Sequence, residues 1–389
     1  MKKSEFQAEK LIILFYFIIN LCTFIIITSS SIYIGDPAGE YYTVPLDIAI
    51  ILFISNTAIY YLLYLIYRCC VSHIAFHNEV IIKRIETLLF LGVTIALLGF
   101  FWIDYGRAEY QSTSPFGFVF RLIPYSVIWL LYVSINSKWN AKRIFLIVYY
   151  VAAKIIMGWS GILLALFWVL FIKYYNAKKR SFLFMCMCMT LLVILYFSAP
   201  IVYYLKYYIR YAGQFEFNYP VLLSKLTARL STIQNVLYIY QNTNVFTNLY
   251  NKYLFDGFYF IEPITSILPR ALLGISATNF ETIYVNIVTG EFNPGVIFYL
   301  GLFGKLLAYF NTGIYNFGNF FIVTFVLLGG LFILLKLNFK KAANPFIFYT
   351  IIQFALSGSI EELSYTLYGI CLVLIFCKIR FGIHNENRY

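Results

Sequence analysis

The feature that most constrains this chain is a series of long apolar runs that carry almost no charge. The first run, between Lys10 and Asp36, holds no charged residue. About 20 apolar residues in a helix cross the hydrocarbon core of a bilayer, where backbone polar groups must be satisfied internally. Only 12% of the residues are charged and 61% are hydrophobic, whereas soluble domains are about one-quarter charged. The sequence therefore predicts an all-α integral membrane protein.

Charged residues fall in the gaps between these runs, and their sign indicates the orientation of the chain. Basic residues gather at both termini and in four short loops, whereas the gap at residues 35–45 holds two acids and no base. Because short cytoplasmic loops carry an excess of Lys and Arg, both termini are predicted to be cytoplasmic. The pattern predicts a polytopic bundle of about ten transmembrane helices, with a range of ten to twelve. The predicted spans are residues 11–34, 46–67, 87–103, 117–135, 144–157, 162–175, 181–202, 317–335, 345–360 and 363–378.

Residues 203–316 form the longest interruption of the apolar pattern, and the charge rule places them outside the cell membrane. They are rich in aromatic and β-branched residues, which argues against disorder and favours short helices. Residues 295–310 are apolar enough to suggest one more span. A crossing there would move the lysines at 336–341 to the outside, so this segment is interpreted as a re-entrant or interfacial helix. Residues 1–389 are thus expected to form one polytopic membrane domain with a large external loop.

Histidine, a common catalytic base and metal ligand, is absent from the segments predicted to lie on the outer side. His73, His77 and His384 all fall in segments predicted to be cytoplasmic, so an outward-facing site has no histidine as base or metal ligand. The chain also lacks the phosphate-binding loop of nucleotide hydrolases. The net charge of +12 comes largely from the inner loops, which argues against nucleic-acid binding. We expect no metal, no cofactor and no nucleic-acid partner.

Several cations on the outer side have no part in setting the orientation. Arg270 follows Pro269, whose ring fixes the backbone, and Arg229 lies in a run with leucines at helical spacing. A guanidinium can bind a phosphate through two parallel hydrogen bonds, so a group of outer arginines suits a lipid-linked diphosphate. Further basic candidates for substrate binding are Arg121, Arg210 and Lys305.

Acidic and aromatic residues accompany these cations in the outer loop. Asp256 and Glu262 flank an aromatic stretch that contains Tyr259. Either carboxylate could deprotonate a sugar hydroxyl, and the ring could stack on a sugar face. Other interpretations stay open: an internal salt bridge to Glu262, Asp256 or Glu281 for each arginine, snorkelling to lipid phosphate for cations at span ends, and an interfacial belt for the aromatic rings.

Three groups of residues, taken in order, resemble the O-antigen polymerases, which polymerise oligosaccharide repeat units of bacterial surface polysaccharides. The first is the pair of short spans joined by GWSG at 158–161. The second is a large outer loop with Arg229, Gly257 and Pro269-Arg270. The third is a glycine-rich return to the membrane, with NPG at 293–295, YFNTG at 309–313 and YNFG at 315–318.

The resemblance implies a metal-independent glycosyltransferase in the bacterial inner membrane. Such an enzyme transfers the growing glycan from undecaprenyl diphosphate to the non-reducing end of an incoming lipid-linked repeat unit, on the outer face. A flippase and a chain-length regulator would be its partners. Arg270 and Arg229 would bind the departing diphosphate and Glu262 or Asp256 would be the general base; the residues expected to bind substrate are Arg210, Arg121, Lys305 and Tyr259.

Two other classes of protein share this plan. A flippase or transporter of the same lipid-linked oligosaccharide would carry related halves and charges in several spans, whereas charge here is concentrated in one outer loop. A polysaccharide-to-lipid ligase generally uses an external histidine, which this chain lacks on the predicted outer side.

Overall fold

The computed structural model describes most of the predicted spans and nearly two-thirds of the large loop. The described residues are 7–76, 78–106, 117–136, 138–159, 161–177, 197, 200–201, 204, 208, 218–219, 229–254, 258–265, 267–268, 273–274, 280–290 and 298–378. Within them every regular element is a helix, and only an isolated bridge between Ile32 and Tyr41 has β geometry. The predicted all-α architecture is confirmed for this part of the chain.

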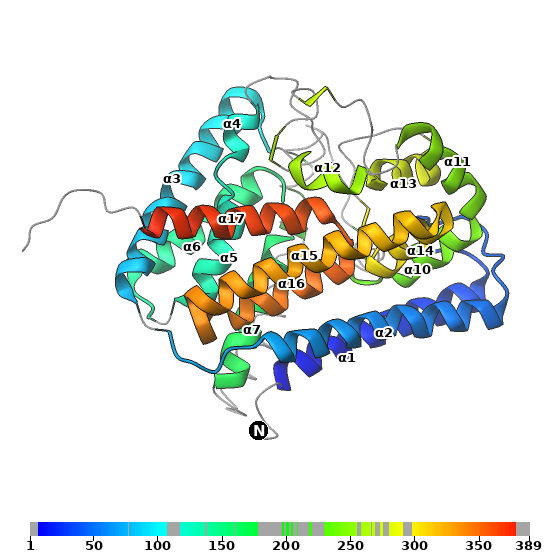
Figure 1. Cartoon of the computed structure of the whole chain (residues 1–389), viewed down its shortest axis with the longest axis horizontal. Coiled ribbons are helices and arrows are strands. Elements are labelled where there is room, and N and C mark those ends of the chain that lie inside the picture. The colour runs from blue at the N-terminus through cyan, green and yellow to red at the C-terminus, as the bar shows by residue number, and fades with distance from the viewer. Residues whose placement is uncertain are drawn as a thin grey trace, which may run out of the picture.

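Figure 1 shows the helices of the described residues in chain order, coloured from the N-terminus to the C-terminus. They are α1 (Gln7–Ser30), α2 (Leu46–Cys70), α3 (Glu79–Ile103), α4 (Gly117–Arg121), α5 (Tyr125–Ile135), α6 (Ala141–Ile156), α7 (Ile162–Ala177), α10 (Ile233–Gln241), α11 (Thr243–Tyr253), α12 (Phe258–Thr265), α13 (Phe280–Thr289), α14 (Leu302–Thr312), α15 (Ile314–Phe339), the 3₁₀ turn η2 (Lys340–Ala343), α16 (Asn344–Ser357) and α17 (Ile360–Lys378).

Five helical segments are long and apolar enough to cross a membrane: α1, α2, α3, the segment Ile314–Ser357 and α17. Their outward sides carry large apolar side chains, such as Ile54 of α2, which is 60% exposed, and Phe325 of α15, which is 65% exposed. Apolar surface of this extent is favourable against lipid and unfavourable against water. The chain is a membrane-embedded helical protein.

The predicted span at 117–135 is two helices in the structure. α4 ends at Arg121 and α5 begins at Tyr125, immediately after Pro124. Proline has no backbone N–H and its ring clashes with the preceding turn, so it starts a helix readily and interrupts one. The predicted short spans at 144–157 and 162–175 are α6 and α7, with 16 residues each. The predicted span at 181–202 lies almost entirely outside the described residues.

The apolar segment predicted as a re-entrant or interfacial helix at 295–310 is helical from Leu302 to Thr312. A helix of this length rises about 16 Å, roughly half of the hydrocarbon core. Gly313, with φ of 138°, separates it from the long helix α15. α14 packs on α10, α11, α15 and α16, and its re-entrant or interfacial placement stays a prediction.

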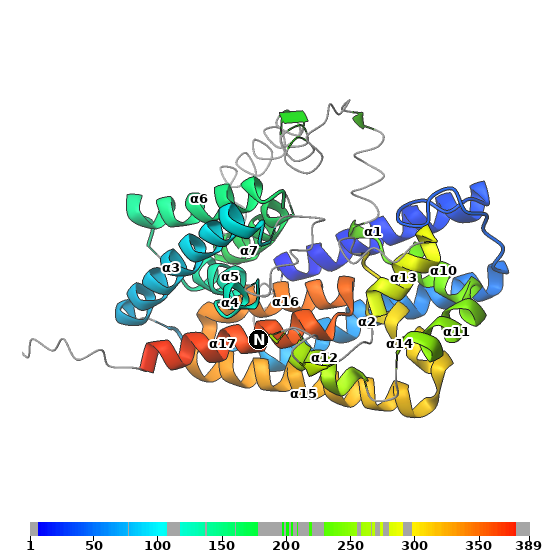
Figure 2. The same cartoon turned by 90° about the horizontal axis from the view of Figure 1, so that it is seen from above.

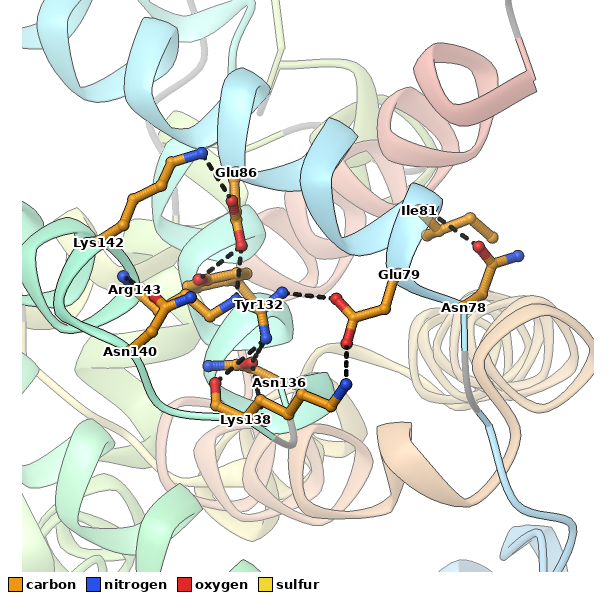
Figure 3. A network of polar contacts seen from close by, with 10 residues as sticks. All are labelled: Asn78, Glu79, Ile81, Glu86, Tyr132, Asn136, Lys138, Asn140, Lys142 and Arg143. Carbon is orange, nitrogen blue, oxygen red and sulfur yellow. Dashed lines mark hydrogen bonds and ion pairs between the residues drawn. The ribbon is translucent and has the colours of Figure 1, made fainter. Parts of the chain in front are cut away.

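Segments predicted to share the cytoplasmic side meet in one ion-pair network (Figure 3). Arg143 of α6 donates to Glu79 at 2.6 Å and to Glu86 at 2.9 Å, both on α3. Lys138 and Lys142 pair with the same two carboxylates at 3.4 and 3.1 Å. The network therefore joins the N-terminal part of α3 to the N-terminal part of α6. We call this part of the bundle the basic end.

At the end of the bundle opposite the basic end, the connection between α1 and α2 lies beside short helices of the large loop. Figures 1 and 2 both place α10, α11, α13 and α14 beside this connection, which spans residues 31–45. The Tyr33 hydroxyl donates to the Gln241 side chain at 3.1 Å, and the backbone N–H of Thr43 donates to the same oxygen at 3.0 Å. We call this region the α10 end.

Candidate functional site

The start of α10 is held between two membrane helices by a buried asparagine. The Asn20 side-chain oxygen, on α1, accepts from the backbone N–H groups of Thr232 and Ile233 at 3.0 Å each. The first N–H groups of a helix have no partner within the helix, so a side chain from elsewhere satisfies them here. Asn56 of α2 accepts from the Thr232 hydroxyl at 3.2 Å. The chain that precedes α10 is thereby fixed against α1 and α2.

Arg229 lies three residues before Thr232 and is exposed. Its guanidinium carbon stands 5.2 Å from the centre of the Tyr299 ring, a cation–π geometry. Tyr299 precedes α14, so the contact joins the two ends of the large loop. A positive charge is thus presented at the α10 end beside an aromatic face.

Asp36 of the α1–α2 connection lies in the same group of residues. The Asn235 side-chain amide donates to Asp36 at 3.3 Å and to the backbone oxygen of Tyr299. The Tyr284 hydroxyl of α13 donates to the side-chain oxygen of Asn235 at 2.8 Å. Burial raises the pKa of Asp36 to about 6, against the opposing effects of the Arg229 charge and the Asn235 hydrogen bond.

A second polar group, of three charged residues, joins α12, α13 and α14. The Lys305 ammonium lies 3.2 Å from Oε1 of Glu262 and 2.8 Å from Oε1 of Glu281. The Lys305 and Glu262 side chains are both 0% exposed. Buried charges persist only when they are paired, and here two carboxylates share one ammonium.

The charge balance of this triad leaves one negative charge in excess. Burial raises the pKa of Glu262 to about 7; the Lys305 charge opposes this rise, and the charges of Glu281 and Glu361 add to it. Burial by itself would lower the pKa of Lys305, but the two carboxylates outweigh it, raise this pKa and keep the ammonium charged. Oε2 of Glu262 has no hydrogen-bond partner among the described residues.

Helix α13 connects the two groups. Glu281 faces Lys305, and Tyr284, one turn later, faces Asn235. On the other side of the triad, the Thr265 hydroxyl of α12 donates to Glu361 in the first turn of α17 at 3.1 Å. The α10 end therefore carries a continuous set of polar residues, of which Arg229 and Asp36 are accessible and the triad is enclosed.

The structure brings together some of the predicted site residues. Arg229, Glu262 and Lys305 all lie at the α10 end. Lys305, predicted to bind substrate, has a side chain that is 0% exposed and forms an internal salt bridge with two carboxylates. Arg121 is exposed in the last turn of α4, which Figures 1 and 2 place apart from α10 and α14.

Other predicted residues cannot be located in the same way. Arg270, Asp256 and Arg210 lie outside the described residues. Tyr259 belongs to α12, but its side chain is not among those described. Their predicted roles therefore stay predictions.

Sequence reasoning missed Asp36, Asn235 and Tyr299 as members of the site. The available signal was the sequence Gly35-Asp36-Pro37 in an outer connection without any base. Glycine and proline around an acid indicate a fixed turn, and such turns often carry functional residues.

The described residues contain no group of three or more His, Cys, Asp or Glu side chains that could hold a metal ion. Comparison of the chain with protein-family models, with curated proteins and with solved structures finds no match.

Proposed function

We propose that this protein polymerises lipid-linked oligosaccharide repeat units, of O-antigen or capsule type. It would transfer the growing glycan from undecaprenyl diphosphate to the non-reducing end of the next lipid-linked unit. The reaction would take place on the outer face of the bacterial inner membrane, with both termini in the cytoplasm. A flippase would supply the repeat units, and a chain-length regulator would act with the polymerase.

The observation that carries this proposal is the position of Arg229 at one end of a bundle with apolar flanks. A polyprenyl chain can lie against the exposed apolar side chains, which leaves its diphosphate at the level of the helix ends. A guanidinium that is exposed beside Tyr299 suits such a headgroup and a neighbouring sugar ring. Arg270 would be the second arginine of this diphosphate site.

The reaction needs a leaving group that is stabilised and an acceptor that loses a proton. The acceptor hydroxyl oxygen forms a bond to the anomeric carbon of the donor glycan, and the bond from this carbon to the diphosphate oxygen breaks. The electron pair of the broken bond goes to the diphosphate, whose charge Arg229 and Arg270 would stabilise. The proton goes to a carboxylate, for which Glu262 and Asp256 are the candidates from the sequence.

The full-length protein in lipid vesicles provides the test. Vesicles that contain a synthetic undecaprenyl-diphosphate repeat unit should yield a ladder of longer lipid-linked glycans. Substitution of Arg229 by alanine should abolish the ladder, and by lysine should restore it only in part, because lysine keeps the charge without the guanidinium fork. Lys252→Ala, which removes an exposed cation of the neighbouring helix α11, is the matched control and should leave the ladder unchanged.

The same vesicles separate the alternative functions. A flippase or transporter would move the repeat unit across the bilayer without lengthening it. A polysaccharide-to-lipid ligase would transfer a finished glycan to a lipid acceptor and leave single repeat units uncoupled. A wild-type protein that moves or ligates glycans but forms no ladder contradicts the proposal.

A further inference from the structure

The connection that carries Asp36 is rigid. Gly35 has φ of +88°, and a Cβ at this position would lie 3.1 Å from the Gln234 side chain. The positive φ favours glycine, and the close approach of the Gln234 side chain leaves little room for a Cβ. Together with the two hydrogen bonds to Gln241, these contacts hold residues 31–45 against α10.

Two further side chains set the direction of the Asp36 carboxylate. The Asn235 nitrogen faces two acceptors, the Tyr299 carbonyl and Asp36, so the Asn235 oxygen must face a donor. The Tyr284 hydroxyl is that donor, at 2.8 Å. Tyr284 thereby fixes the orientation of the amide, and the amide fixes one oxygen of Asp36, as partners of a functional carboxylate usually do.

Accessibility distinguishes Asp36 from the carboxylate that the sequence favours. Asp36 is partly exposed and Arg229 is exposed, so a substrate can reach both. Glu262 is 0% exposed, and one of its oxygens is held by Lys305. A base must come within hydrogen-bond reach of the proton that it removes, and of these two carboxylates Asp36 is the more exposed.

We infer that Asp36 is the catalytic base that removes the proton of the acceptor sugar hydroxyl, while Asn235 and Tyr284 position it. This inference rests on the proposed polymerase function and adds a residue to its site. The hydroxyl proton moves to a carboxylate oxygen of Asp36 as the hydroxyl oxygen attacks the anomeric carbon, and the diphosphate leaves with its electron pair beside Arg229. The Glu262–Lys305–Glu281 triad holds α12, α13 and α14 in place around this site.

The inference explains why an acid stands near the arginine that would bind phosphate. A carboxylate close to Arg229 weakens the attraction of the site for a diphosphate, since like charges repel. Such an acid is a disadvantage for a protein that only binds the lipid. It is useful where a proton must leave the acceptor next to the departing diphosphate.

The test compares Asp36→Asn with wild type in two measurements on the full-length protein. One is the rate of coupling of synthetic undecaprenyl-diphosphate repeat units in vesicles, and the other is the affinity for a short-chain polyprenyl diphosphate. Asparagine keeps the hydrogen bond from Asn235 but accepts no proton. We expect the coupling rate to fall by about 10²–10⁴-fold, with affinity equal to or above that of wild type. Glu40→Gln, an exposed acid of the same connection, is the control and should couple normally.

Each other result has a definite meaning. Coupling by Asp36→Asn within about threefold of wild type overturns the inference and leaves the proposed function intact. A parallel loss of coupling and affinity also overturns it, because Asp36 would then only orient Arg229. An Asp36→Asn protein whose unfolding temperature is lower is compared with Asp36→Glu, which retains a carboxylate and should recover part of the coupling rate. A wild-type protein that forms no ladder refutes the proposed function itself.

Discussion

The Lys305 ammonium lies 2.8 Å from Glu281 and 3.2 Å from Glu262, so one buried charge joins three short helices of the large loop. These helices, α12, α13 and α14, come from different parts of the loop and share no backbone ladder. The triad therefore joins α12 and α14 to α13, the helix whose Tyr284 contacts Asn235.

Substitution of Lys305 by methionine should destabilise the protein strongly. It would leave two carboxylates buried without a cation, and loss of one partner of a buried ion pair costs about 3–5 kcal/mol. Glu262→Gln should cost clearly less, because the triad holds one carboxylate more than it has ammonium groups. Thermal unfolding in detergent measures both. Equal losses for the two variants would contradict the charge balance described above.

Stability should fall as the pH rises from about 5 to 7. Burial raises the pKa of Glu262 from 4.5 to about 7, so the folded state binds more protons than the unfolded state in this range. Stability conferred by the protonated form is complete below pH 4.5 and is lost as the pH rises toward 7. Asp36, whose pKa burial raises to about 6, contributes with the same sign.

Unfolding temperatures measured between pH 4.5 and 8 test this relation. The slope should be smaller in Glu262→Gln and smaller again when Asp36→Asn is added. A wild-type protein that becomes more stable between pH 5 and 7 would show that Glu262 is ionised in the folded state throughout.

Loss of the Tyr284 hydroxyl should move the pH dependence of coupling to higher pH. Asp36 must be ionised to accept a proton, so the rate rises as the pH passes the pKa of Asp36, which burial sets at about 6. Among the described residues, the groups that face Asp36 are Arg229, Asn235, Tyr299 and Tyr284. In Tyr284→Phe the Asn235 amide is no longer held, its hydrogen bond to Asp36 weakens, and the pKa of Asp36 rises.

The pH–rate profile distinguishes this effect from a general loss of structure. A purely structural defect lowers the rate by the same factor at every pH, whereas positioning moves the midpoint. Tyr240→Phe, on the same helix as Asn235, provides the control, since none of the contacts described for Asp36 involves Tyr240. An unshifted midpoint in Tyr284→Phe argues against a positioning role.

The sequence predicted the positions of several long apolar helices because lipid thickness and charge act along the chain, while the count of about ten spans stays a prediction. The predicted span 46–67 is α2 at Leu46–Cys70, and the predicted span 363–378 lies within α17 at Ile360–Lys378. Arg229 could be singled out for a similar reason, since the charge rule does not require a cation there. Pro124 is itself a local signal for the end of one helix and the start of another, although hydropathy alone predicts a single span at 117–135.

The site itself depends on contacts between segments that no local pattern connects. Asp36 and Asn235 are 199 residues apart in the chain, and α13 reaches both the triad and Asn235. Periodicity indicates which face of a helix is buried, but it does not indicate which helix ends meet. For this reason the sequence presented Lys305 as a substrate ligand, whereas packing encloses it between Glu262 and Glu281.

Substitution of Asn20 by alanine should uncouple the site from the membrane helices. The change removes the acceptor of the Thr232 and Ile233 N–H groups, which are fully buried at the start of α10. A buried donor without a partner costs about 1–3 kcal/mol, so the two losses together should lower the unfolding temperature. Arg229 and Asn235 flank this anchor, so coupling should fall as well. Ser29→Ala, an exposed residue near the end of α1, should leave stability and coupling unchanged. A stable Asn20→Ala protein with normal coupling would show that α10 keeps its place through its apolar contacts alone.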